Sequence, residues 1–385
     1  MAPYALLLLI VAFLVALALL RRTSGSPAVA SRTTAPAANV RGIRAARTLF
    51  DLLIVGILCL FSGARWFVGT DYLLYSLVFE QVDARDWSAT FASSPHEAGF
   101  TILSLLVKTA TDNPAWLFAT VSALTIAITY AAIRLLSENA TVSLLVFVLF
   151  AQYFFAFNAV RQGLAIAIVF LAVGLWRRSH RVLTALAAVL AGLMHSSAFV
   201  ALAIAVAFLL LRRRPLTLRA YALGILPVSF AARFAMSMPL VSDLASRINP
   251  RYAEYIAAST SAGLGSYLVL TVHAVLVAVS IAALRDAPQY AWLVKVYALA
   301  VPFMVIGTAA VELSRMANFF SWALILLVPA LLHAPKLRWR RVAVLTMCFG
   351  YLYCLVYLLN YGGLIPYADV FGLFDRSDVR IHVPG

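Results

Sequence analysis

The chain carries little charge, few acids and almost no cysteine. Charged residues make up 12% of its 385 residues, whereas soluble domains carry about 25%. The low charge, together with an apolar share of 64%, excludes an ordinary soluble enzyme and a disordered protein. The three cysteines lie in apolar runs, and no paired Cys or His spacing typical of a metal site or a disulfide framework occurs. We therefore predict no cofactor, although acids near Asp71 are ligands of the kind that a divalent cation prefers.

Apolar residues make up 64% of the chain, and they recur in runs of about 20, the length that crosses a bilayer as a helix. We predict an all-α, polytopic integral membrane protein with about 12 transmembrane helices plus one re-entrant or interfacial segment. The predicted spans are 4–20, 48–64, 115–136, 142–157, 159–176, 182–194, 197–211, 216–235, 267–284, 289–310, 315–334 and 342–360.

Two apolar segments do not fit a single crossing. The segment 98–111 is short and contains Lys108, so we predict that it is re-entrant or interfacial. The run 182–211 is too long for one untilted span, and it holds the polar tripeptide His195-Ser196-Ser197 near its middle. We therefore expect two short helices that turn at this tripeptide.

The excess of basic residues indicates orientation. There are 30 Lys and Arg against 15 Asp and Glu, and the positive-inside rule places densely basic loops in the cytoplasm. The predicted spans satisfy this rule when 98–111 does not cross and 182–211 crosses twice. The net charge of +15 then needs no nucleic-acid partner. The basic clusters are Arg21 to Arg47, Arg177 to Arg181, Arg212 to Arg219 and Lys336 to Arg341.

The same topology divides the chain into three regions. Residues 1–47 form an N-terminal transmembrane helix and a basic cytoplasmic linker rich in Ser, Thr, Ala and Pro. Residues 48–370 form a polytopic membrane domain. Residues 371–385 form a tail outside the cytoplasm.

Polar residues at membrane level are costly and are candidates for function. On the predicted topology they gather at the outer leaflet, and two more lie in the outer loop 236–266. Each has a structural alternative: Asp71 as a helix N-cap, Arg161 as an interface anchor and His195 as a turn residue. Glu312 and Arg315, three residues apart, have the alternative of a simple ion pair. The candidates are Asp71, Asn158, Arg161, Gln162, His195, Arg251, Tyr252, Glu312 and Arg315.

Arginines grouped with a histidine and acids suit an anionic headgroup, especially a diphosphate. Guanidinium groups bind phosphate oxygens in pairs and stay charged. The motifs GxxxxGK[ST], GxGxxG and HExxH are absent from the sequence, so neither a nucleotide site nor a zinc protease is supported.

Several short motifs carry a family resemblance. The central one runs from Asn158 to Ala165, with Arg161-Gln162-Gly163 at its core, and Met194-His195-Ser196-Ser197-Ala198 follows. The others are Val68 to Tyr72 with Tyr75, Glu97 to Phe100, Arg251 to Tyr255, Arg315 with Phe319-Phe320, and Ile365-Pro366-Tyr367. Through these motifs, residues from about 50 to 370 resemble the EpsG family of bacterial exopolysaccharide proteins, which are related in role to Wzy-type polymerases.

The resemblance implies a glycosyltransferase of the bacterial cytoplasmic (inner) membrane, with several membrane passes. It would polymerise undecaprenyl diphosphate-linked oligosaccharide repeat units into exopolysaccharide at the outer face. The family role also suggests a chain-length regulator as a partner, beside membrane lipid.

We expect Arg161 and Arg315 to bind the diphosphate, with Arg251 in support. His195 is the leading candidate for the base. Asp71 and Glu312 are its rivals, and the sequence does not choose between them. The predicted substrate contacts also include Asn158, Gln162 and Tyr252.

Other functions stay open at this point. The chain could be a ligase for finished glycan, a metal-dependent glycosyltransferase that uses polyprenyl monophosphate sugars, or an acyltransferase that decorates sugars. It could also be a transporter or flippase for the lipid-linked unit. A flippase needs polar residues along its depth, whereas the deep positions of most predicted spans are Ala, Leu and Val.

Overall fold

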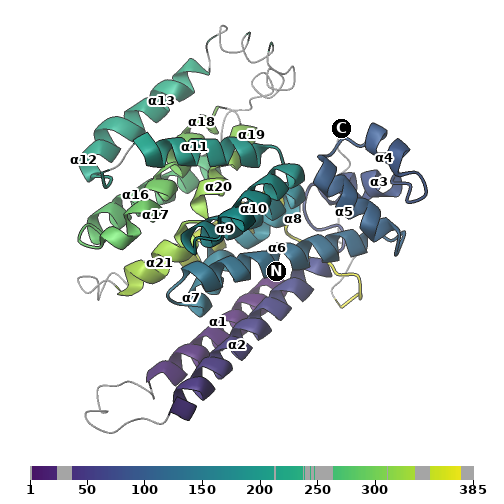
Figure 1. Ribbon diagram of the computed structural model, residues 1–385, viewed down its shortest axis with the longest axis horizontal. Helices are drawn as coiled ribbons and strands as arrows, with labels where there is room; N and C mark the ends of the chain where they lie inside the picture. Colours follow the sequence, from purple (N-terminus) through teal and green to yellow (C-terminus); the bar gives the residue numbers. More distant parts are fainter. Residues whose placement is uncertain are drawn as a thin grey trace. The chain divides into compact units, whose positions relative to one another are not determined.

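The computed structural model describes residues 2–23, 37–211, 214–236, 238, 243, 247, 263–309, 311–333 and 347–373. Every regular element in these ranges is helical (Figure 1). The strand-type pairing within them is an isolated antiparallel bridge between Arg65 and Asp369. The structure therefore confirms the all-α class. The chain divides into two compact units, Met1–His195 with Val356–Gly385, and Ser196–Leu355.

The first unit is built mainly from ten α-helices. Helix α9 packs against α6 and α10, α6 also packs against α2, and α1 lies beside α2 (Figure 1). The helices are α1 (Ala2–Thr23), α2 (Ala37–Gly63), α3 (Tyr72–Glu80), α4 (Trp87–Ser93), α5 (Ala98–Lys108), α6 (Ala115–Leu136), α7 (Ala140–Leu149), α8 (Gln152–Asn158), α9 (Val160–Arg177) and α10 (Arg181–Met194). The 3₁₀ helix η5 (Tyr361–Gly363) follows late in the chain.

The late segment after residue 355 returns to the first unit and packs with the start of the chain. The ring of Tyr367 stacks on Phe61 with centroids 4.2 Å apart, and both lie within 5.6 Å of the ring of Tyr4. The Tyr4 hydroxyl donates a hydrogen bond to the carbonyl of Leu364. The first helix is therefore part of this unit's core.

Helices α7 and α8 form one bent apolar segment. Asn139 is the N-cap of α7, and its side chain accepts a hydrogen bond from the N–H of Val142 at 3.3 Å. Ala151 takes a left-handed conformation (φ 57°, ψ 10°) between the two helices, which are bent by 51°. The predicted span 142–157 is thus broken near its middle.

The second unit contains α11 (Ser197–Leu211), α12 (Leu218–Ala220), η1 (Tyr221–Ile225), α13 (Leu226–Ala235), α16 (Leu264–Ala283), η2 (Pro288–Tyr290), α17 (Ala291–Ala298), α18 (Ala300–Ile306), α19 (Val311–Ser314), η3 (Arg315–Ala317), α20 (Asn318–Ser321) and α21 (Leu324–His333). The π-helix η4 (Cys354–Leu358) crosses the boundary between the units. Buried polar contacts join three segments of the second unit. Nδ1 of His273 lies 3.0 Å from the Tyr297 hydroxyl, and Nε2 of His273 lies 3.3 Å from the Tyr351 hydroxyl.

The structure does not confirm the predicted count of about 12 spans. Within the described ranges, five helical segments are long and apolar enough to cross a membrane, or up to seven if each bent pair is one span. Part of the difference arises from two short helices. Helices α10 and α11 have 14 and 15 residues, and a rise of about 1.5 Å per residue makes them shorter than the hydrocarbon core of about 30 Å.

The break predicted inside 182–211 is confirmed. Helix α10 ends at Met194 and α11 begins at Ser197, and His195 between them has an extended backbone (φ −157°, ψ 119°). Helix α5 has 11 residues, about 17 Å by the same rise, so it is too short to cross a bilayer as one helix. This length agrees with a re-entrant or interfacial segment.

Candidate functional site

A helix break places Arg161. Helix α8 ends at Asn158 and α9 begins at Val160, while Ala159 between them has a non-helical backbone (φ −79°, ψ 63°). Arg161 and the buried Gln162 therefore stand in the first turn of α9. Backbone N–H groups in a first turn have no partner within their own helix, and this end of the helix dipole favours negative charge.

Asn158 holds the loop before α3 against this break. Its Oδ1 accepts hydrogen bonds from the N–H of Thr70 at 2.7 Å and from the Thr70 hydroxyl at 3.3 Å. Gly69 has φ +101°, and a Cβ there would lie 2.6 Å from Asn158 Oδ1, so a side chain at this position would be strained and would clash. The N–H of Thr70 also donates to the carbonyl of Gly362. Thr70 thus connects the break at Asn158 with the late segment at Gly362.

A buried arginine, Arg65, packs against the residue that precedes Asn158 and this break. Arg65 is 1% exposed and donates to the carbonyl of Ser62 at 2.6 Å and to the hydroxyl of Ser122 at 3.1 Å. Its guanidinium lies 4.7 Å from the ring centre of Phe157, the residue before Asn158. A desolvated cation over an aromatic ring is stabilising by about 2 kcal/mol.

Asp71 occupies the N-cap position of α3, but its side chain makes no capping hydrogen bond. Its Oδ1 instead accepts from the Thr70 hydroxyl at 3.0 Å. The N-cap alternative is therefore right about the position of Asp71 and wrong about capping by its carboxylate.

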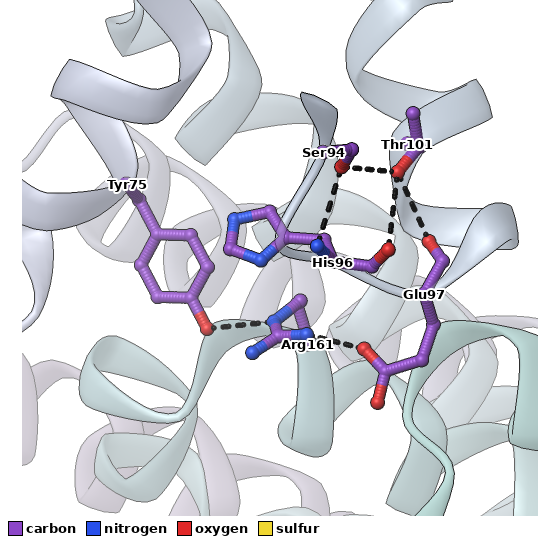
Figure 2. A network of polar contacts seen from close by, with 6 residues as sticks. All are labelled: Tyr75, Ser94, His96, Glu97, Thr101 and Arg161. Carbon is purple, nitrogen blue, oxygen red and sulfur yellow. Dashed lines mark hydrogen bonds and ion pairs between the residues drawn. The ribbon is translucent and has the colours of Figure 1, made fainter. Parts of the chain in front are cut away.

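Arg161 is held by two side chains from other elements (Figure 2). Its head group forms an ion pair with the carboxylate of Glu97, the residue before α5, and its Nε donates to the hydroxyl of Tyr75 in α3 at 3.3 Å. The Arg161 and Glu97 side chains are 20% and 22% exposed. The guanidinium is thus fixed in place while part of it still faces outward, as an anion-binding group requires.

The loop from Ser94 to Glu97 is shaped by hydroxyl groups (Figure 2). The hydroxyls of Ser94 and Thr101 lie 2.7 Å apart, and Ser94 Oγ accepts from the N–H of His96 at 3.2 Å. The Thr101 hydroxyl donates to the Glu97 carbonyl at 3.2 Å. Glu97 is the N-cap of α5 but makes no side-chain capping bond. Its carboxylate therefore reaches Arg161 instead of capping the helix.

His96 lies between these groups. Its ring packs against Tyr75 and Phe100, with centroids 5.5 Å and 5.4 Å apart. Both ring nitrogens are buried and have no hydrogen-bond partner among the described residues. Burial and the nearby Arg161 lower the pKa of His96 to about 4, although Glu97 raises it. The imidazole is therefore neutral at pH 7.

A close helix contact links this loop to His195. A Cβ at Gly99 in α5 would lie 2.9 Å from the Cβ and carbonyl oxygen of Leu193 and from Cε of Met194 in α10. The absence of a side chain at Gly99 thus lets α5 approach the end of α10, directly before His195. His195 itself is half-buried and takes part in at least one polar, ring or electrostatic interaction.

Comparison with known proteins decides the family. The EpsG family matches residues 48–368, which is most of the chain. This chain belongs to the EpsG family. Neither the curated proteins nor the solved structures contain a match. The family suggests a membrane protein of polysaccharide biosynthesis that resembles a polymerase, and the apolar helices agree with a membrane location.

The four remaining predicted site residues of this EpsG-family protein belong to the second unit or fall outside the described residues. Arg315 begins η3 of the second unit and is half-buried. Glu312 lies in α19, and its side chain is outside what the structure describes. Arg251 and Tyr252 fall outside the described residues. The roles predicted for all four stay predictions.

Sequence reasoning missed Tyr75, His96 and Glu97 as site residues. Tyr75 and Glu97 belong to the motifs that carry the EpsG resemblance, but nothing along the chain pairs them with Arg161. His96 lies just outside those motifs. The sequence does place a histidine and an acid, His96 and Glu97, directly before the apolar segment 98–111, which is too short to cross the membrane.

Proposed function

We propose that this EpsG-family protein polymerises undecaprenyl diphosphate-linked oligosaccharide units at the outer face of the bacterial cytoplasmic membrane. The observation that carries the proposal is the fixed guanidinium of Arg161 at the start of α9, on a side chain that is 20% exposed. A cation and the N-terminal end of a helix together favour a diphosphate. The family match supports the polysaccharide substrate class.

The proposed glycosyl transfer requires above all a site that binds the anionic leaving group. When an acceptor hydroxyl attacks the anomeric carbon of the donor sugar, negative charge develops on the leaving diphosphate. Arg161 would stabilise this charge, and the diphosphate would replace the carboxylate of Glu97 as its partner. Preorganised donors of this kind contribute about 10²–10³ in rate. Arg315 and Arg251 remain the proposed supporting cations.

Substitution of Arg161 tests the anion site. We expect Arg161→Ala to lower polymerisation by about 10²–10³, because the diphosphate loses its main partner. Arg161→Lys should restore activity only partly, since an ammonium group cannot make the paired contacts of a guanidinium. The measurement is chain extension of a lipid-linked oligosaccharide by purified protein in detergent.

The matched control is Arg178→Ala, at an exposed arginine just after the other end of α9. It should extend chains at the wild-type rate. Wild-type extension by Arg161→Ala would overturn the proposed anion site.

Mass analysis of lipid-linked glycans in cells without the protein separates polymerase from ligase. We expect single repeat units to accumulate. Accumulation of finished polymer would instead show a ligase. Export of the unit across the membrane without bond formation would show a transporter.

A further inference from the structure

The inference concerns the proton acceptor and rests on the proposed function. His96 has two buried ring nitrogens with no partner among the described residues. A buried polar group without a partner costs about 1–3 kcal/mol, and native proteins leave few of them without a water, an ion or a ligand. The two nitrogens therefore mark positions that a bound polar group would satisfy.

The position of the imidazole indicates which ligand group this is. Figure 2 shows the ring beside Tyr75 and next to the head group of Arg161. Arg161 donates to Tyr75 and pairs with Glu97, so the anion site and the unpartnered imidazole share the same neighbours. A sugar whose diphosphate is bound at Arg161 would bring its reacting carbon to this place.

We propose that His96, rather than His195, accepts the proton of the attacking hydroxyl. The hydroxyl oxygen forms a bond to the anomeric carbon, and the bond from that carbon to the diphosphate oxygen breaks. The electron pair of the broken bond stays with the diphosphate at Arg161. The hydroxyl proton passes to the unprotonated nitrogen of His96, and the imidazolium that forms releases it to water afterwards.

The charges around His96 make this step depend on the donor substrate. The charged and titratable groups that face the ring are Arg161 from α9, Tyr75 from α3 and Glu97 from its own loop. Arg161 is the neighbour that lowers the pKa of the imidazole. A diphosphate bound to Arg161 adds negative charge there, which raises this pKa toward its ordinary value of about 6.5. The base thus strengthens when the donor is in place.

Kinetics of His96→Gln test the proposal. Glutamine keeps polar atoms at the site but cannot take up a proton, so we expect kcat to fall by about 10²–10⁴ with the KM for the lipid-linked donor unchanged. His180→Gln is the matched control, because His180 is exposed before α10, and it should keep the wild-type kcat. A wild-type kcat for His96→Gln would overturn the inference. If Arg161→Ala is inactive in the same assay, the proposed function still stands.

A second variant decides the matter if His96→Gln does not accumulate in the membrane. Glu97→Gln keeps the imidazole but removes the negative charge that raises its pKa. The pKa of His96 should then fall, and the acidic limb of the plot of kcat/KM against pH should move to lower pH. An acidic limb that stays in place would overturn the role of His96. Failure of the wild-type protein to extend any lipid-linked unit would instead overturn the proposed function.

Discussion

At the scale of single residues, the charge state of His96 makes stability depend on pH. Its pKa is about 4 in the folded protein and about 6.5 in an unfolded chain. Between these values the unfolded chain binds a proton that the folded chain does not, so stability falls as the pH is lowered from about 6.5 to about 4. His96→Gln removes this contribution. Its melting temperature in detergent should therefore fall less than that of the wild type between about pH 7 and about pH 4.5.

The exposed His180 again provides the comparison. His180→Gln should lose melting temperature on acidification as the wild type does. Equal losses for the wild type and His96→Gln would contradict a depressed pKa at His96.

At the scale of helices, one glycine sets the distance between α5 and α10. A methyl group at Gly99 would meet Leu193 and Met194 at 2.9 Å, so Gly99→Ala must push α5 away. Overpacking of this kind costs about 1–3 kcal/mol. We expect a lower melting temperature and, because Glu97 precedes α5, reduced chain extension as well.

Gly56 in α2 is the matched control, because a Cβ there meets nothing within 4 Å. Gly56→Ala should raise stability by about 0.4–1 kcal/mol, since alanine has less freedom to lose in the unfolded chain. A Gly99→Ala variant as stable and active as Gly56→Ala would show that α5 does not need this close approach.

At the scale of the whole molecule, the basic loops predict which ends of the helices face the cytoplasm. If α5 does not cross the membrane, cysteines placed before its first residue and after its last residue should both react with a membrane-impermeant thiol reagent from outside. Suitable exposed positions are Ser93 and Thr109. A cysteine at the exposed Arg178, within a basic cluster, should not react. Labelling of intact cells with the three native cysteines replaced is the measurement.

Labelling at only one of Ser93 and Thr109 would show that α5 crosses the membrane. Labelling at Arg178 from outside would reverse the orientation.

Much of the fold and part of the site follow from properties that can be read along the chain. The lengths of the apolar runs predict helices 115–136 and 159–176 within one residue of α6 and α9. The polar tripeptide predicts the break at His195. The cost of a polar group at membrane level points to Arg161. These are local signals, because hydropathy and charge belong to each segment by itself.

The tertiary structure decided the rest. The pairing of Arg161 with Glu97 joins residues 64 positions apart and depends on where α3, α5 and α9 pack, which no periodicity records. The burial of His96 depends on Tyr75 and Phe100 in the same way. The bend inside the predicted span 142–157 also escaped the sequence, because Ala151 breaks the helix through its backbone conformation. By itself the sequence determined the helices, their orientation signal and one cation of the site; only packing between distant segments determined which side chains surround that cation.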